Sequence, residues 1–392
     1  MRVKTKHRWR LVLARELRRI VSRPVYAIMT LVIPLGCLLF FGTFMPEGLP
    51  ERLPIGVIDQ DGSTLTRKII RQIDATQQTK VSDKYLHYSE ARSAMQKGDI
   101  YAFVILPEHF QKDVMNGMQP TIHFYYNQTF LIPGSLVLKN ISYVLNTICG
   151  GANLQTRQAK GQTTAESMGQ ILPISPEMHA IGNPSTNYSI YLLNVILPGM
   201  LQLMILLTTV YSIGIELKKN SSRKWLRTAG NSMKNALFGK ILPFTIAFTI
   251  MSWFYDICLF KFMDYPLNNS IGWMFLDSFL LVLAAQALGV LMIGVFPVLR
   301  DGLSFSGLYG VLAFSYSGLS FPIEGMPAML QGLSYAFPLR WFFKIYQGIA
   351  LNGLSPYYSL PYYGYMLLYL VLPILIFRRL KKAAFEMTYP KK

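Results

Sequence analysis

The segment 215–243, IELKKNSSRKWLRTAGNSMKNALFGKILP, separates two long apolar runs and decides how the rest of the chain is arranged. It carries seven Lys/Arg residues and a single acidic residue, Glu216. Within it, residues 223–230 form a compact amphipathic piece in which Trp225 and Leu226 stand among the charges. A short basic segment between apolar runs of this length is typical of a cytoplasmic loop in a membrane protein.

The composition of the whole chain agrees with a membrane protein. Of 392 residues, 52% are hydrophobic and only 15% are charged, whereas about a quarter of the residues of a soluble domain are charged. The three cysteines are too few and too scattered for a disulfide framework or a thiolate metal site. The five histidines have no metal-ligand spacing, so no catalytic or metal site is predicted.

The formal charge of +18 is concentrated in three segments that flank apolar runs. Residues 1–23, 216–240 and 378–392 hold 22 Lys/Arg and three acidic residues, and the remainder of the chain has a net charge of −1. In a soluble protein such an excess would suggest nucleic-acid binding. Because the charge borders apolar runs, it indicates instead which ends of those runs face the cytoplasm.

Six apolar runs are long enough to cross a bilayer as helices. With a cytoplasmic N-terminus, six crossings place all three basic segments, including a coupling loop at 215–240 and a basic tail at 378–392, on one side. A cleaved signal peptide is the alternative for the first run, but no small-x-small site follows it. Before it, residues 1–24 are expected to form an amphipathic helix on the membrane surface. The predicted spans are 25–45, 190–214, 241–260, 276–299, 302–321 and 360–377, with residues 300–301 as a tight link between the fourth and fifth.

Residues 46–189 differ from the rest, because their acidic and basic residues balance and their apolar residues alternate as in a small soluble α/β domain. About 145 residues are enough to bury a core. The predicted fold is therefore an α-helical polytopic membrane protein with an inserted α/β extracytoplasmic domain. Its expected strands are 54–59, 101–106 and 121–126; its helices follow Ser63 and Ser89 and occupy 107–117 and 133–159, and a polar arm at 160–187 leads back to the membrane.

Residues 322–359 are too apolar for an ordinary loop and are interrupted by four prolines. Broken helices at membrane depth are tolerated only where protein or a cavity surrounds them, so we expect re-entrant helices in the outer leaflet. The alternative is a surface helix whose aromatic residues form a belt at the membrane interface, namely Trp341, Phe342, Phe343 and Tyr346.

Five motifs occur in a characteristic order: ELRRI at 16–20 before Arg23-Pro24, VIDQD at 57–61, NPSTNY at 183–188, GKILP at 239–243, and SGLSFP at 317–322 before Met326-Pro327. Together they resemble the permease subunits of ABC-2 type ABC exporters, in the multidrug branch with a large extracytoplasmic domain. The resemblance covers nearly the whole chain. One departure is ELKKNS at 216–221, where a lysine replaces the second acidic residue of the family pattern.

This resemblance implies several partners. A separate ATP-binding subunit, which holds ATP and Mg, would bind the coupling loop, and a second permease copy or a paralogue would complete a dimer in the bacterial inner membrane. A periplasmic adaptor and an outer-membrane channel would carry the exported substrate onward from the permease. The chain itself binds no cofactor and is not an enzyme, since its nearest phosphate-loop pattern, at 230–241, lacks the Ser/Thr that would hold Mg²⁺. The predicted docking residues are Glu216, Arg223, Lys224, Trp225, Leu226 and Arg227, with Trp225 and Leu226 projecting from a basic face; the alternative is a loop whose charges only fix orientation.

The predicted function is export of an amphipathic or hydrophobic substrate. Asp256 and Asp277 are expected near the outer ends of their spans, where they reach water, and with Gln286 they are candidates for the substrate path; Asn187, Asn194 and Gln202 are weaker ones. The predicted exit gate comprises Ser317, Gly318, Phe321, Pro322, Met326 and Pro327. An ATP-independent scaffold or receptor that displays the α/β domain is the main alternative. A secondary transporter would need an ion-coupling group deep within a span.

Overall fold

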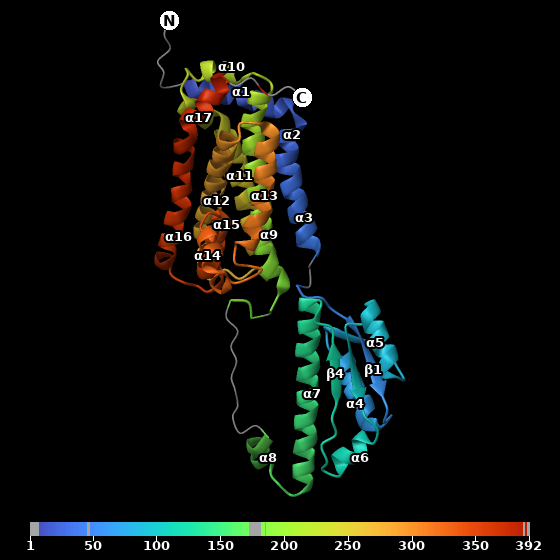
Figure 1. The fold of residues 1–392 in the computed structure, drawn as a ribbon. Coiled ribbons are helices and arrows are strands. Elements are labelled where there is room, and N and C mark those ends of the chain that lie inside the picture. Colours follow the sequence, from blue (N-terminus) through green and yellow to red (C-terminus); the bar gives the residue numbers. More distant parts are fainter. Residues whose placement is uncertain (1–7, 45–47, 172–181, 185, 387–388, 390–392) are drawn as a thin grey trace. The chain divides into compact units, whose positions relative to one another are not determined.

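The computed structural model describes residues 8–44, 48–171, 182–184, 186–386 and 389 (Figure 1). The chain divides into two compact units, one formed by residues 1–46 with 180–392 and the other by residues 47–179. The first unit is helical in its described part, and the second contains a four-stranded sheet.

Within the described residues of the first unit, five helices are long and apolar enough to cross a membrane. Three of them run further than predicted: α9 continues to Lys218, α11 begins at Met233, and the last covers Pro356–Glu386. The expected loop at 215–240 is therefore largely helical: its two ends belong to α9 and α11, and its middle contains the short helix α10, Ser222–Thr228. The five helices are Pro24–Thr43 (α2, a π turn and α3), Tyr188–Lys218 (α9), Met233–Phe262 (α11 and a π turn), Ile271–Val295 (α12) and Pro356–Glu386 (α16, a 3₁₀ turn and α17).

The fifth predicted span, 302–321, corresponds to α13, Leu299–Ser315, which has 17 residues. Its boundaries were predicted wrongly at both ends. Arg300 and Asp301 form the first turn of α13 rather than a link, because the chain turns at residues 296–298 around Pro297, which has no backbone N–H to continue α12. At the other end, the chain leaves the helix after Ser315, and Gly318 adopts a φ of +88° that glycine tolerates best.

Helices α1, Arg8–Ser22, and α10 lie at the end of the bundle where α9 ends and α11 begins (Figure 1). The main partner of α1 is α11. This contact depends on Gly239, because a Cβ atom there would collide with the backbone carbonyl of Trp9. The predicted amphipathic helix is thus packed on other helices along one side.

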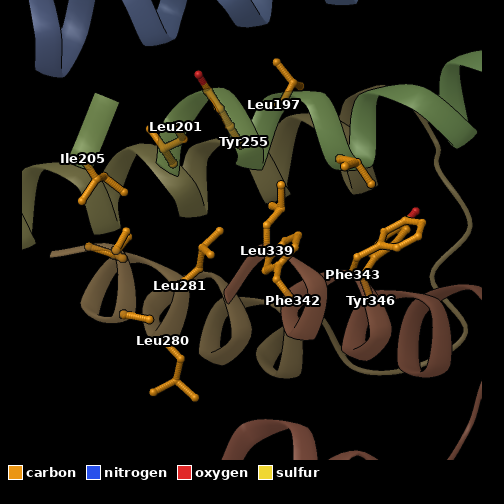
Figure 2. Close-up of a cluster of buried hydrophobic side chains, with 14 of the residues drawn as sticks. Leu197, Leu201, Ile205, Tyr255, Leu280, Leu281, Leu339, Phe342, Phe343 and Tyr346 are labelled. Atoms are coloured by element: carbon orange, nitrogen blue, oxygen red, sulfur yellow. The ribbon is translucent and has the colours of Figure 1, made fainter. Parts of the chain in front are cut away.

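The segment 322–359 is built into the bundle. It contains a 3₁₀ turn at Ile323–Gly325, α14 at Ala328–Ser334, α15 at Pro338–Tyr346 and a π turn at Gln347–Leu351. Leu339, Phe342, Phe343 and Tyr346 of α15 face residues of α9 and α12 such as Leu197 and Leu281 (Figure 2). The alternative of an exposed aromatic belt is therefore wrong, since Trp341, Phe342, Phe343 and Tyr346 are all buried.

The second unit is an α/β fold with strand order β2-β1-β3-β4, in which β1 is parallel to both neighbours and β4 is antiparallel to β3. One core lies against α4, α6 and α7, and a smaller one lies beside α5. Strand β2 was missed because its residues are mostly exposed and polar, and the expected polar arm contains α8; its continuation at 172–181 lies outside the described residues. The elements are β1 Leu53–Asp59, α4 Thr64–Asp74, β2 Thr79–Lys84, α5 Tyr88–Lys97, β3 Ala102–Leu106, α6 Phe110–Met115, β4 His123–Tyr126, α7 Leu131–Ala159 and α8 Thr164–Ile171.

Candidate functional site

Five charged side chains from three helices form a buried ion-pair cluster: Arg15, Glu16 and Arg19 of α1, Glu216 of α9 and Lys240 of α11. Lys240 Nζ lies 2.8 Å from Glu16 Oε2 and 3.2 Å from Glu216 Oε1. Arg15 Nη2 lies 3.0 Å from Glu216 Oε2, and Arg19 Nη1 pairs with Glu216 Oε1. Both carboxylates and the ammonium group are completely buried.

The position of each charge in its helix explains why the cluster forms. Glu216 lies in the last turn of α9, where the negative end of the helix dipole disfavours a carboxylate. Arg15, Arg19 and Lys240 supply the compensating positive charge. Burial is stable only when such charges are paired and hydrogen-bonded, so the cluster holds α1, α9 and α11 together.

The two arginines of the ion-pair cluster are partly buried. Desolvation lowers the pKa of Arg15, and the neighbouring Glu16 acts in the opposite direction. The pKa of Arg19 is lowered mainly by the same burial, with a further contribution from Arg15. Arginine keeps its charge in proteins even so, and both arginines therefore contribute positive charge to the cluster.

Helix α10 is connected to the ion-pair cluster. The ammonium group of Lys240 lies 5.3 Å from the centroid of the Trp225 ring, within cation–π range. The Trp225 indole N–H donates to the carbonyl of Ala236 at 3.3 Å, and the Ser221 hydroxyl just before α10 bonds the Glu216 carboxylate. A displacement of α10 would therefore disturb the contacts of the cluster.

This arrangement corrects part of the predicted docking surface. Trp225 and Leu226 do not project from a basic face; both are fully buried in a core with Val12 and Leu380. Glu216 is buried in the ion-pair cluster as well. The apolar side of an amphipathic helix packs against available apolar neighbours, and here α1, α11 and α17 provide them. The exposed predicted docking residues are Arg223, Lys224 and Arg227.

A second feature is an apolar groove of about 950 Å³ formed by α11, α12 and the last long helix. Gln286 of α12 lies in its wall and is 3% exposed. The Gln286 Oε1 atom accepts a hydrogen bond from Thr245 Oγ1 at 2.8 Å, whereas its Nε2 atom has no partner among the described residues. The Thr249 hydroxyl, which also lines the groove, is equally without a partner there.

Asp256 and Asp277 lie elsewhere and do not line the groove. They were expected to reach water near the ends of their spans, but both are buried. Asp256 Oδ2 accepts a hydrogen bond from Ser278 Oγ at 2.8 Å. Neither carboxylate oxygen of Asp277 has a partner among the described residues. Asp256 lies on α11 and Asp277 on α12, two helices that pack against each other.

Comparison with known proteins places the chain in a family. A family model described as "ABC-2 family transporter protein" matches residues 24–379. The chain belongs to the ABC-2 transporter family. It is also 21% identical, over 367 residues, to the linearmycin resistance permease protein of Bacillus subtilis (strain 168), covering 86% of this chain and 90% of that relative. The resemblance inferred from the motifs is thus confirmed.

In this ABC-2 chain the predicted gate residues gather in the loop after α13. Ser317 is buried and bonds the carbonyl of Phe314 at 2.7 Å, and the Tyr191 hydroxyl of α9 donates to the carbonyl of Leu319. Gln331 Nε2 donates to the carbonyl of Met326 at 2.8 Å. Phe321, Pro322 and Pro327 are exposed. Their role as a gate stays a prediction.

Sequence reasoning missed the ion-pair cluster and, in the groove, Thr249; Gln286 had been named as a candidate for the substrate path. One signal was available: the two basic segments at 1–23 and 216–240 each contain a single acidic residue, Glu16 and Glu216. A lone acid among many cations in a helix next to the membrane is a candidate for a buried pair. Of the weaker candidates, Asn187 caps α9, Asn194 bonds the carbonyl of Ile190, and Gln202 is buried without a partner among the described residues.

Proposed function

We propose that this chain is the permease subunit of an ATP-driven exporter in the bacterial inner membrane, with both termini cytoplasmic. In this proposal α13 is the sixth crossing and residues 47–179 form the extracytoplasmic domain. The assembled transporter contains two permease chains and two ATP-binding subunits, and the ATP and Mg²⁺ belong to the latter. Membership of the ABC-2 family and the five long apolar helices support this.

The observation that carries the proposal is the ion-pair cluster. An exporter driven by a separate motor has to transmit force from a cytoplasmic contact to the membrane helices. Here the buried face of α10 contacts Lys240 through Trp225, and Lys240 joins α1 to α9 and α11. Movement of α10 would therefore be passed directly to two of the five long helices.

The exposed face of α10 is the proposed contact for the ATP-binding subunit. It presents Arg223, Lys224 and Arg227, while the opposite face is buried. The Arg223 guanidinium also donates to the carbonyl of Phe385 at 2.8 Å, which ties α10 to the end of α17. Lys224 and Arg227 make no such contact to another helix among the described residues, so they are the better residues to test.

The substrate is proposed to be an amphipathic or hydrophobic molecule taken from the cytoplasm or the membrane. The relative in Bacillus subtilis is named for linearmycin resistance, and removal of a harmful compound is one route to resistance. The largely apolar groove on this chain suits a hydrophobic molecule better than a highly charged one.

The test is purification of the transporter from cells that express the permease together with its ATP-binding subunit. Lys224→Glu combined with Arg227→Glu should release the ATP-binding subunit and abolish ATP-dependent export of the substrate. The matched control is Lys381→Glu with Lys382→Glu, which reverses two exposed charges on α17. An intact complex that exports normally after reversal on α10 would contradict the proposed contact.

A further inference from the structure

The apolar groove is long and has two different ends. Its wall on α11 runs from Lys234 to Trp253, which is about 28 Å along the helix axis and close to the thickness of the hydrocarbon core of a bilayer. Exposed apolar side chains such as Phe238, Ile246 and Ile250 follow one stripe of α11 along this length. A compact ligand would leave most of this stripe uncovered.

Among the described residues that line the groove, positive charge is found at one end. Lys234 lines the groove in the first turn of α11 and is exposed. Phe377 lines the same end from α17 and is followed directly by the exposed Arg378. The far end, near Trp253 and Phe279, is apolar. The charge complementarity therefore favours a ligand with an anionic group at one end of an apolar body.

The wall also contains a polar site that lacks a partner. Gln286 donates with Nε2 to no described residue, and the hydroxyl of Thr249 is likewise unpaired. The Gln286 side chain is held by Thr245, which is about 16 Å from Lys234 along α11. An unpaired buried amide costs free energy, so a plain hydrocarbon chain is a poor match for this part of the groove.

We propose that the groove binds a long amphiphile with an anionic head at Lys234 and an oxygen atom, from a hydroxyl or carbonyl group, opposite Gln286 midway along its body. This deepens the proposed function, on which it rests, by naming the substrate class and its place of binding. Gln286 Nε2 donates to the oxygen, and the Thr249 hydroxyl lies in the same wall. The position of the oxygen distinguishes the substrate from a membrane phospholipid, whose acyl chains have no polar atom at that depth.

The proposal is tested by binding of tritium-labelled 12-hydroxystearate and stearate to the purified transporter in a scintillation-proximity assay without ATP. These probes share the carboxylate and the chain length and differ in one mid-chain hydroxyl. We expect the wild-type transporter to prefer 12-hydroxystearate by about fivefold to tenfold, as one added hydrogen bond predicts. Gln286→Leu should remove this preference while stearate binding is retained.

Two controls separate the groove from other causes. Gln202→Leu removes another buried, unpaired amide, on α9 outside the groove, and should leave the preference unchanged. Lys234→Gln should weaken binding of both probes severalfold, whereas Lys219→Gln, which removes an exposed lysine that does not line the groove, should not. Thr249→Val provides a second variant of the polar site if Gln286→Leu lowers the yield of folded protein.

Equal binding of both probes by the wild type, or a preference that survives Gln286→Leu, overturns the proposal. Two other results also overturn the proposal. Native mass spectrometry could find phospholipid in the groove, retained equally well without Gln286. Cysteine cross-linking could find a second permease copy bound there. Because the assay needs no ATP, the outcomes remain separable: binding without export refutes the proposed function alone, and export without the probe preference refutes the groove alone.

Discussion

Helix α11 carries a buried basic side chain, Lys240, and a buried acidic one, Asp256, about 24 Å apart along its axis. At Lys240, charges of both signs from α1 and α9 complete an ion-paired network. At Asp256, the neighbouring acid Asp277 has no hydrogen-bond partner in the described part of the chain. One helix therefore combines a polar site that is almost fully paired with one that is not.

The paired site at Lys240 holds helices together, whereas the unpaired groups are suited to binding. A network in which most of the charges are paired stabilises one arrangement of helices, and removing one member leaves another charge without compensation. The unpaired polar groups of Asp277 and Gln286 do not stabilise the fold of the permease chain alone. In a transporter, such groups are suited to a ligand or to a second conformation. Substitutions at both kinds of site test this contrast.

The largest effect is expected for Lys240→Met, which leaves Glu16 buried without its main partner. Breaking a buried ion pair from one side costs about 3 to 5 kcal/mol. The midpoint of thermal unfolding in detergent should fall sharply, and a second substitution, Glu16→Gln, should restore part of the loss. Lys219→Met, at an exposed position, is the control. A loss below about 1 kcal/mol for Lys240→Met would show that the cluster does not hold the helices.

A smaller loss is expected for Gly239→Ala, which tests the packing that brings the ion-pair cluster together. The added methyl group would collide with the Trp9 carbonyl and move α1 away from α11, at a cost of about 1 to 3 kcal/mol. Gly36→Ala on α3 is the matched control, because a Cβ atom added there would meet no other atom within 4 Å. Equal unfolding midpoints for the two variants would contradict the close approach of α1 and α11.

The unpaired site should respond in the opposite direction. Asp277→Leu removes a buried carboxylic group without a described partner and should raise the free energy of unfolding by about 1 to 2 kcal/mol. Asp256→Leu should raise the free energy of unfolding by a smaller amount or not at all, because it leaves the Ser278 hydroxyl unpaired. Chemical unfolding in detergent measures both. If Asp277→Leu destabilises the protein, the carboxyl group is paired after all and the contrast with the ion-pair cluster fails.

The smallest effect is expected at the surface. Lys382 and Glu386 of α17 form an exposed pair at 3.8 Å, and such pairs contribute about 0.5 kcal/mol or less. Lys382→Ala should leave the unfolding midpoint almost unchanged at low and at high salt. A loss comparable to that of Lys240→Met would mean that burial does not separate the two kinds of ion pair.

Much of the helical unit was predictable, because the length of an apolar run and the positions of proline and glycine are local properties. The errors in the two boundaries of α13 have local causes too. The turn between α12 and α13 lies at Pro297, earlier than predicted, and α13 ends at Ser315, shortly before Gly318. Strand β2 was not predicted, because an exposed edge strand lacks the alternation of apolar residues that marks a buried strand.

The sites were less predictable. The prediction that Trp225 projects toward a partner was wrong, because the sequence of a helix with one apolar face does not show whether that face meets a partner or its own chain. Gln286 was named as a candidate for the substrate path, and that role stays a prediction. Its unpaired amide and the groove around it could not be read from the sequence, because they depend on side chains from three helices.

The sequence by itself determined a membrane protein of long apolar helices, a separate soluble-type insertion and three basic segments at the ends of those helices. These follow from apolar length and charge, which are written in consecutive residues. Only the tertiary structure decided which charges are buried and which polar groups remain unpaired. Glu16 and Lys240 are 224 positions apart in the sequence, so their ion pair forms only when the helices pack. Packing removes water from ionic and amide groups, and each group then stabilises or destabilises the fold according to whether its new neighbours pair with it.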